Sequence, residues 1–380
     1  MRILHVQRVR GIAGSENYLF QILPALKKEK VDLSFVMLTK PGEEQINRPF
    51  VERLQQYEVP IETVHFGGRA NATLIPRLRQ AVIRSGCDIV HSHLIHADVF
   101  MAMVRLTMPS MVLVSTKHGY EENYTNEHGF DPAHRRKNLY FRANQFSERL
   151  VSGSYAISHG LKRFFVEGGV SDPARMGMIH YGFDFSTVSY DPNFERYRFG
   201  DPQLVIVGRL VPFKGHRYAI DCMPELIRRF PALKLVIVGS GQIEGDLRRQ
   251  IATRGLEASV LLEGYRPNAH DYMRASDVVL VPSVSEGFGA VFLEAFNNRR
   301  PVIAFDVPAS NEIIETGVSG LLIPPYDTGA MTEAITSLLR DSKRRDDLAA
   351  GGHARLTSYF CLDRMTRETI EFYRRMLAKR

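Results

Sequence analysis

A strand–turn–helix unit is predicted for the segment Asp277-Val-Val-Leu-Val-Pro-Ser-Val-Ser-Glu-Gly-Phe-Gly-Ala-Val-Phe-Leu-Glu294. The run from Val278 to Val281 is continuously apolar, which is typical of a strand that is buried on both faces of a parallel sheet. Pro282 ends that strand because proline has no N–H to donate to the ladder. A helix is expected to start near Gly289, and the unit as a whole indicates an α/β fold.

The turn of this unit combines features of an anion site with features of a sugar site. Gly287 and Gly289 flank Phe288, so the backbone N–H groups there can lie close to a ligand at the positive end of the helix. Glu286 and Glu294 are poor partners for phosphate and good partners for sugar hydroxyls. A ligand that carries both phosphate and sugar is therefore predicted. An ordinary turn with two solvated glutamates is the alternative.

The same residues resemble a known family signature. Pro282-Ser-x-x-Glu286-Gly-Phe-Gly, with Glu294 completing an E-x7-E spacing, is similar to the motif of the GT4 family of retaining glycosyltransferases. The resemblance covers essentially the whole chain and implies the GT-B fold, in which two Rossmann-like, doubly wound parallel-sheet domains face a central cleft. By this resemblance Glu286 holds the donor sugar and Glu294 holds the ribose hydroxyls.

Composition is that of a soluble globular protein large enough for two domains. The chain has 380 residues, of which 44% are hydrophobic and 24% are charged. We expect a cytoplasmic protein, because the start is strand-like and the sequence contains no run of about 20 apolar residues. A net charge of +7 is compatible with peripheral contact to an anionic membrane, and no motif indicates nucleic acid. The three cysteines lack metal-site spacing, so we expect no metal: Cys87, Cys222 and Cys361.

Strand-like runs alternate with helix-like runs in two successive series, which predicts two parallel sheets. We expect one domain at 1–185, a second at 200–355 and a final helix at 356–380. The GT-B resemblance implies that the first domain binds the acceptor, that the second binds the nucleotide-sugar, and that the final helix returns to the first domain. A linker is expected over 184–202. The predicted strands are Ile3–Val6, Val31–Leu38, Asp88–His91, Val112–Thr116, Leu204–Gly208, Leu235–Gly239, Val260–Leu262, Val278–Val281, Val302–Phe305 and Leu321–Ile323.

The first loop, Arg10-Gly-Ile-Ala-Gly14-Ser-Glu16, is glycine-rich but is not a dinucleotide fingerprint. This absence disfavours a nicotinamide dehydrogenase. The loop resembles the family's Gly-Gly-x-Glu quartet, with Ala13 in place of the first glycine and with Gly14 and Glu16 matching. Gly14 is accordingly expected to let the backbone approach a bound sugar or diphosphate, and a tight turn is the alternative.

Histidines follow two strands of the first series. His91, His93 and His96 lack a carboxylate cluster that would complete a metal site, so structural or substrate-contacting roles are expected. His118 follows the next strand, in Ser-Thr-Lys-His-Gly. The resemblance implies that His118 contacts the donor sugar.

A basic and aromatic segment follows His118. Arg135, Arg136 and Lys137 precede a helix-like stretch with several aromatic residues. We hypothesise that this segment binds a phosphorylated or lipid-linked acceptor beside an anionic membrane, and a solvated helix is the alternative.

Two cations follow the first strand of the second series. Gly208-Arg209-Leu-Val-Pro-Phe-Lys214-Gly215 places a guanidinium and an ammonium group in one strand-to-helix loop, where they can neutralise a departing diphosphate. The pattern resembles the family's donor-phosphate motif. Further along, Gly241 is expected beside the donor, and Tyr265 and Arg266 are expected beside the base.

These features predict a metal-independent, retaining glycosyltransferase that needs no cofactor besides its nucleotide-sugar co-substrate. A UDP-sugar is the expected donor. The acceptor is expected to be a glycan or lipid-linked saccharide in polysaccharide or lipopolysaccharide biosynthesis. A covalent intermediate and same-face attack both remain open. The alternatives are a sugar-nucleotide epimerase of GT-B architecture and an inactive GT-B binding or scaffold subunit.

Overall fold

The computed structural model describes residues 1–68, 71–121, 124–125, 128–131 and 137–379. Arg135 and Arg136, which the sequence suggested for acceptor binding, lie outside these ranges. The described residues form two compact units. The first comprises residues 1–121, 131–182 and 361–380, and the second comprises residues 122–130 and 183–360. None of the described helices combines the length and the apolar character that a membrane span requires.

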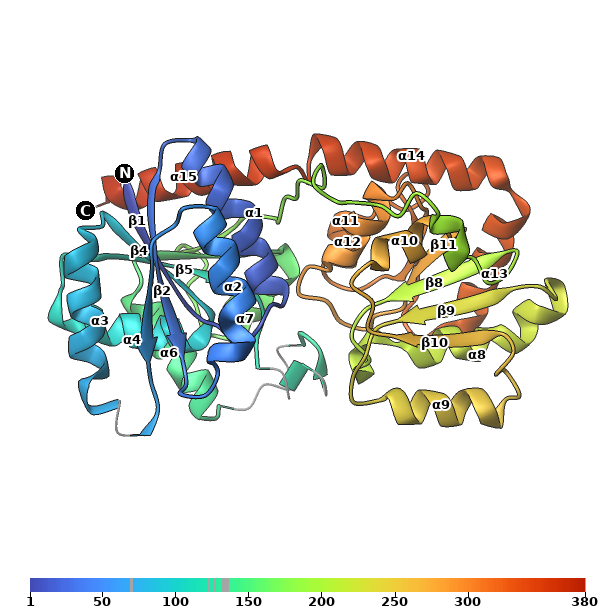
Figure 1. Cartoon of the computed structure of the whole chain (residues 1–380), viewed down its shortest axis with the longest axis horizontal. Coiled ribbons are helices and arrows are strands. Elements are labelled where there is room, and N and C mark those ends of the chain that lie inside the picture. Colours follow the sequence, from blue (N-terminus) through green and yellow to red (C-terminus); the bar gives the residue numbers. More distant parts are fainter. Residues whose placement is uncertain (69–70, 122–123, 126–127, 132–136, 380) are drawn as a thin grey trace. The chain divides into compact units, whose positions relative to one another are not determined.

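The first unit is built on a parallel sheet in which seven strands are described, in the order β3-β2-β1-β4-β5-β6-β7 (Figure 1). Connections of this doubly wound kind leave helices on both faces of a parallel sheet. The strands are β1 (Arg2–Arg8), β2 (Asp32–Thr39), β3 (Ile61–His65), β4 (Ile89–His93), β5 (Val112–Lys117), β6 (Gly153–Ala156) and β7 (Met176–Met178). The helices are α1 (Gly14–Lys28), α2 (Glu44–Gln56), α3 (Asn71–Ser85), α4 (Leu94–Thr107), α6 (Leu139–Leu150), α7 (His159–Glu167) and α15 (Leu362–Ala378).

Three of these strands were not predicted, and each lacks the continuous apolar run on which the prediction relied. β3 has two adjacent polar residues at its centre, lies at one edge of the sheet and is only partly buried. β6 reads Gly-Ser-Tyr-Ala and contains no β-branched residue, and β7 has three residues at the other edge. These strands form because neighbouring elements pack against them, and their own composition does not indicate a strand.

The second unit contains a parallel sheet in which six strands are described, in the order β10-β9-β8-β11-β12-β13. The predicted strands of this series match those observed. They are β8 (Gln203–Val207), β9 (Lys234–Val238), β10 (Val260–Gly264), β11 (Val278–Val281), β12 (Val302–Phe305) and β13 (Leu321–Ile323). The helical segments are η3 (Phe194–Tyr197), η4 (Pro212–Lys214), α8 (His216–Arg229), α9 (Glu244–Thr253), α10 (Ala269–Arg274), α11 (Ala290–Asn297), α12 (Ser310–Ile313), α13 (Thr328–Arg340) and α14 (Ser342–Ser358).

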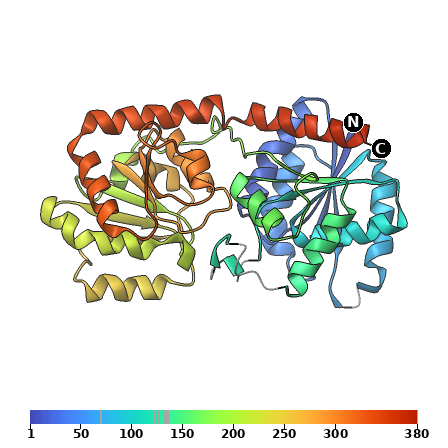
Figure 2. The ribbon, with the colours of Figure 1, turned by 180° about the vertical axis from the view of Figure 1, so that it is seen from behind.

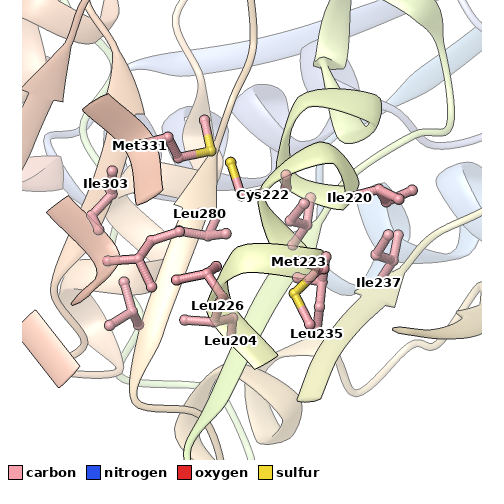
Figure 3. Packing of buried hydrophobic residues seen from close by; sticks show 14 of the residues in the cluster. Leu204, Ile220, Cys222, Met223, Leu226, Leu235, Ile237, Leu280, Ile303 and Met331 are labelled. Carbon is pink, nitrogen blue, oxygen red and sulfur yellow. The ribbon is translucent and has the colours of Figure 1, made fainter. Parts of the chain in front are cut away.

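The core of the second unit fixes α8 against the middle of its sheet. Ile220, Met223 and Leu226 lie on one face of α8 and pack against Leu204 of β8 and Leu235 of β9 (Figure 3). All five side chains are fully buried, and burial of each such side chain stabilises the fold by roughly 1.5–3 kcal/mol. This packing sets the position of the α8 N-terminus at the carboxyl end of β8.

The last helix differs from its expected limits. One helix was expected from Leu356 to Arg380, whereas α14 ends at Ser358 and α15 begins at Leu362. Phe360, between them, is fully buried, and Cys361 has an extended backbone at the N-cap of α15. α15 belongs to the first unit, so the N-terminal strand and the C-terminal helix lie in the same unit (Figure 2). Arg364 Nη2 of α15 donates to the carbonyl of His180 at 2.8 Å.

Candidate functional site

The sheet of the second unit reverses its strand order between β8 and β11. β9 and β10 lie on one side of β8, and β12 and β13 lie beyond β11. In open parallel sheets the crevice at the carboxyl ends of such a strand pair is where ligands bind. The loops that leave β8 and β11 carry Lys214 and Glu286, so the structure brings these two predicted residues to the same edge.

Glycine makes the close approach of these two loops possible. Gly215 has φ +69°, and a Cβ there would lie 1.8 Å from the carbonyl oxygen of Pro282. Gly241, in the loop after β9, likewise allows a close approach to the loop after β8, because a Cβ on Gly241 would lie 2.4 Å from the carbonyl oxygen of Leu210. A Cβ on Gly208 would have no atom within 4 Å, so the backbone of that residue faces open space. At Gly215 and Gly241 only glycine allows the loops to pack this closely.

Lys214 and Glu286 form an ion pair across the two loops. Lys214 Nζ donates to Glu286 Oε1 at 2.6 Å, and the two side chains are 18% and 6% exposed. Because both groups are largely removed from water, their attraction is much stronger than that of a surface pair. Arg209, in the same loop as Lys214, is exposed to solvent. The edge therefore presents a largely buried ammonium group and an exposed guanidinium group.

The turn before α11 is shaped by Gly289 and by the buried ring of Phe288. Gly289 is the N-cap residue of α11 with φ +87°, and a Cβ there would collide with the ring of Phe292. The side chain of Phe288 is buried against Phe360, with ring centroids 6.0 Å apart. Phe288 can thus offer a ligand only its backbone, as can Gly287.

Glu294 lies in the second turn of α11 and has a neighbour that the sequence did not suggest. Burial raises the pKa of the Glu294 carboxyl, and the positive charges of His270 and Lys214 act in the opposite direction. His270 is held in place by Asn298, whose Nδ2 lies 3.0 Å from His270 Nδ1. His270 is separated from Glu294 in sequence, so only the fold reveals this proximity.

Tyr265 and Arg266 follow β10, two strands away from β8. The Tyr265 side chain is 74% exposed. Arg266 Nη2 donates to Glu263 Oε2 at 3.1 Å, and the hydroxyl of Tyr272 donates to the same oxygen at 3.0 Å. An exposed aromatic ring beside a fixed guanidinium is a suitable surface for a planar base.

A small hollow with a cavity volume of about 10 Å³, partly open to solvent, lies between the ends of β8 and β11. Gly208, Lys214, His216 and Ser283 contribute to its lining. His216 is fully buried, and neither ring nitrogen has a hydrogen-bond partner among the described residues. Burial, followed by the charge of Lys214, lowers the pKa of His216 to about 4, so the imidazole is neutral. His216 was not among the residues predicted from the sequence, although it directly follows the Lys-Gly pair.

In the first unit His118 ends a chain of hydrogen-bonded rings. Its Nε2 lies 3.0 Å from His93 Nδ1, and its Nδ1 is hydrogen-bonded to the hydroxyl of Tyr181. His93 Nε2 in turn lies 3.0 Å from His5 Nδ1. Burial lowers the pKa of both His118 and His5 to about 3, so these rings are neutral. Both ring nitrogens of His118 are therefore engaged within the domain.

His5, His91 and His93 lie close enough together to be compared with a metal site. His91 Nδ1 lies 2.7 Å from the hydroxyl of Tyr373, and His91 Nε2 lies 2.7 Å from Thr116 Oγ1. His91 is thus bonded at both nitrogens, as is His93. These partners give His91 and His93 a structural role that ties β4 to α15 and to β5.

Gly14 and Glu16 lie where the first loop enters α1. Glu16 Oε2 accepts from the backbone N–H of Ala13 at 3.0 Å, and Glu16 Oε1 accepts from the side-chain amide of Gln7. Glu16 is buried, which raises its pKa. The Glu16 side chain, which itself belongs to α1, therefore caps the N-terminus of that helix. A Cβ on Gly14 would have no atom within 4 Å, so the helix end is open above it.

On the opposite face of the first sheet, Lys117 is buried between two carboxylates. Lys117 Nζ lies 2.6 Å from Asp98 Oδ2 and 2.8 Å from Glu148 Oε1. Burial alone would lower the pKa of Lys117, but Asp98 and Glu148 raise it above its usual value. This triad was not predicted from the sequence, because its members lie on three different elements.

Two family models match the chain, one for each half. Residues 12–187 match the model described as Glycosyltransferase Family 4. Residues 191–355 match the model described as Glycosyl transferases group 1.

Curated relatives align with part of the chain. The α-D-kanosaminyltransferase of Streptomyces kanamyceticus is 36% identical over 160 residues, which are 41% of either chain. The phosphatidyl-myo-inositol mannosyltransferase of Mycobacterium leprae is 30% identical over 213 residues, 55% of either chain. The lipopolysaccharide core biosynthesis mannosyltransferase LpsB of Rhizobium meliloti is 30% identical over 177 residues, 45% of this chain and 50% of LpsB. The chain thus spans about half the length of these relatives.

Solved structures resemble the whole chain. HepE of Anabaena, in complex with UDP and glucose, superposes with a TM-score of 0.82 at 21% identity, covering 98% of this chain and 99% of that one. Sucrose-phosphate synthase of Thermosynechococcus elongatus superposes with a TM-score of 0.79 at 17% identity, covering 100% of both chains. At these identities the likeness establishes the fold, which is GT-B.

Proposed function

This chain belongs to the group 1, family 4 glycosyltransferases, and we propose that it transfers a sugar from a nucleotide-sugar donor to a saccharide acceptor with retention of configuration. The observation that carries the proposal is the Lys214–Glu286 ion pair at the strand-order reversal between β8 and β11. It places a cation for a phosphate beside a carboxylate for sugar hydroxyls, and a nucleotide-sugar contains both groups.

We place the donor on the second domain, residues 200–355, with its diphosphate between the β8–α8 and β11–α11 loops. Arg209 and Lys214 would neutralise charge that develops on the leaving diphosphate. The backbone N–H groups of Gly287 to Gly289 and the positive end of α11 would add to this stabilisation. Because two cations are present for this purpose, we expect turnover without a divalent metal.

Glu286 suits the donor sugar better than it suits a covalent role. Its Oε1 atom accepts from Lys214 Nζ at 2.6 Å, and a carboxylate that is paired with an ammonium group is a weaker nucleophile. This pairing favours same-face attack, in which the leaving phosphate accepts the acceptor's proton. Glu294 and the Tyr265–Arg266 surface would bind the ribose and the base.

The acceptor and His118 belong to the first domain in this proposal. His118 would contact the donor sugar, and since both of its ring nitrogens are bonded, a sugar hydroxyl must replace Tyr181 or His93. Of the two partners, Tyr181 is the easier to replace, because His93 is itself held by His5. Gly14 leaves the adjacent helix end accessible to the acceptor or the diphosphate.

The names of similar proteins support particular substrates for a first test. Three HepE structures were solved with UDP, with UDP-glucose, and with UDP and glucose, which supports a UDP-sugar donor. The relatives named for phosphatidyl-myo-inositol and for lipopolysaccharide core support a lipid-linked or glycan acceptor. For a lipid-linked acceptor we propose peripheral contact with the cytoplasmic face of a membrane.

A thermal-shift panel of UDP-, GDP- and ADP-glucose in EDTA tests the donor site. A ligand at 100 times its Kd stabilises the folded protein by about 2.7 kcal/mol, so we expect one base class to raise the Tm of the wild type. Lys214→Met should abolish that rise, whereas Lys343→Met, which removes an equal charge from the exposed face of α14, should keep it.

The buried partner of Lys214 requires a second variant. Lys214→Met leaves the Glu286 carboxylate unpaired, so each shift is compared with the same variant without ligand. Lys214→Met/Glu286→Gln removes both charges and should restore the Tm but not the ligand response. Equal responses of the wild type and both variants would contradict the proposed donor site. Consumption of the donor without any acceptor, giving an isomeric nucleotide-sugar, would instead identify an epimerase.

A further inference from the structure

We propose that the acceptor of this enzyme carries an anionic group, a phosphate or a carboxylate on a sugar or polyol, and that Arg8, Arg10 and Lys40 of the first domain bind it. The inference rests on the proposed function, in which the first domain holds the acceptor. It adds the chemical class of that acceptor.

The three cations converge on one edge of the sheet. Arg8 is the last residue of β1, Lys40 directly follows β2, and Arg10 lies in the loop between β1 and α1. β1 and β2 are neighbours and run parallel, with Arg8 opposite Leu38. Their carboxyl ends therefore meet at the edge where open parallel sheets bind ligands.

A single carboxylate contacts two of the cations and the backbone of the third residue. Glu43 Oε1 lies 3.4 Å from Arg8 Nη2 and 4.0 Å from Arg10 Nε. Glu43 Oε2 accepts from the backbone N–H of Lys40 at 2.9 Å. The neighbouring Glu44 accepts from the backbone N–H of Gly42. Counting the three cationic side chains against Glu43 and Glu44 leaves one formal positive charge among these five residues.

Arg8 is held in place without all of its donors being used. Its guanidinium lies over the ring of Phe66, 5.5 Å from the centroid. Its side chain is 20% exposed. Its Nε is buried and has no hydrogen-bond partner among the residues that the structure describes. A guanidinium that an aromatic ring holds in place and that remains partly exposed can donate to an anion from its Nη atoms.

His96 lies beside this edge of the sheet. His96 lies in the first turn of α4, which follows β4, and its ring centroid is 5.8 Å from that of Phe66. Burial lowers its pKa first, and the charges of Arg8 and Lys40 lower it further. The His96 imidazole beside the cations can hydrogen-bond a ligand hydroxyl.

Anionic and neutral acceptor fragments can be compared directly by calorimetry at low salt in the presence of UDP. The probes are myo-inositol 1-phosphate against myo-inositol, glucose 6-phosphate against glucose, and glucuronate against glucose. We expect at least one anion to bind about tenfold or more tightly than its neutral parent, since charge-assisted bonds of this kind are strong. Added salt should weaken that binding.

A matched pair of variants assigns the effect to the proposed residues. Arg10→Gln/Lys40→Gln removes two exposed charges from the edge. Lys28→Gln/Arg163→Gln removes one lysine and one arginine from exposed positions on α1 and α7 of the same domain. The first variant should lose about tenfold in affinity for the anion and keep its affinity for UDP. The control should match the wild type in both.

Vesicles of phosphatidylcholine with and without phosphatidylinositol distinguish a lipid-linked anion from a free one. Vesicle binding that the edge variant loses assigns the anion to a lipid headgroup, and binding of a soluble probe assigns it to a free sugar. The inference is overturned if anions bind no better than their neutral parents and the vesicles do not bind. It is also overturned if the edge variant equals its control. Failure of the wild type to bind UDP would instead count against the proposed function.

Discussion

Gly215→Ala should damage the second domain far more than an ordinary glycine substitution does. Two costs add at this position. An alanine at φ +69° pays about 1–2 kcal/mol for left-handed backbone. Its Cβ would also lie 1.8 Å from the carbonyl oxygen of Pro282. That atom belongs to the backbone and cannot turn away, so the two loops must separate, at a cost of about 1–3 kcal/mol.

Gly255→Ala is the matched control. Gly255 belongs to the same domain and has φ +63°, but a Cβ there would have no atom within 4 Å. Gly255→Ala therefore carries the backbone cost of about 1–2 kcal/mol without the collision. Gly215→Ala should reach about 2–5 kcal/mol. The difference between the two variants isolates the contact between the Lys214 loop and the Glu286 loop.

Urea unfolding measures the stability of both variants, and calorimetry measures their affinity for UDP. We expect Gly215→Ala to unfold at clearly lower urea than Gly255→Ala and to bind UDP at least tenfold more weakly, because the cations no longer meet the α11 N-terminus. Equal unfolding midpoints together with unchanged affinity would refute the idea that this contact builds the site.

Two further predictions concern buried titratable groups, namely the Lys117 triad of the first domain and the histidines His5 and His216. Lys117→Met leaves Asp98 and Glu148 as buried carboxylates without a cation, so urea unfolding at neutral pH should show a loss of about 3–5 kcal/mol; a loss below about 1 kcal/mol would contradict the buried triad. Stability should also fall as pH is lowered from about 7.5 to 5, because His5 and His216 have folded pKa values of about 3 and 4 and unfolded values near 6.5. The unfolded chain then binds protons that the folded chain does not, which lowers the free energy of unfolding by about 2 kcal/mol per histidine at pH 5. His216→Gln removes one of these histidines and should make the free energy of unfolding depend less steeply on pH. An unchanged dependence on pH would contradict the prediction.

The strands of the second domain could be predicted from the sequence because each of them contains a run of apolar residues. Val278 to Val281 and Val302 to Phe305 are apolar at every position and are fully buried. The Lys214 and Glu286 loops follow such strands, so the prediction that they share one sheet edge needed no tertiary information. β6 and β7 carry no such signal, and the helix break at Phe360 contains neither glycine nor proline.

The remaining site features depend on register and on loop packing, which one sequence does not reveal. His5 pairs with His91 across β1 and β4, and this register brings His93 to His5 and to His118. Burial of His216 depends on the closeness of Gly215 to Pro282. The cations at the β1–β2 edge are likewise separated in sequence, and the parallel pairing of β1 with β2 brings them to the same edge.

Hydrogen–deuterium exchange with and without UDP tests most directly whether the nucleotide binds at the reversal between β8 and β11. We expect slower exchange at residues 208–216 and 283–290 of the wild type, and no such protection in Lys214→Met. Protection confined to residues 8–16 of the first domain, with none at residues 283–290, would contradict binding at the reversal.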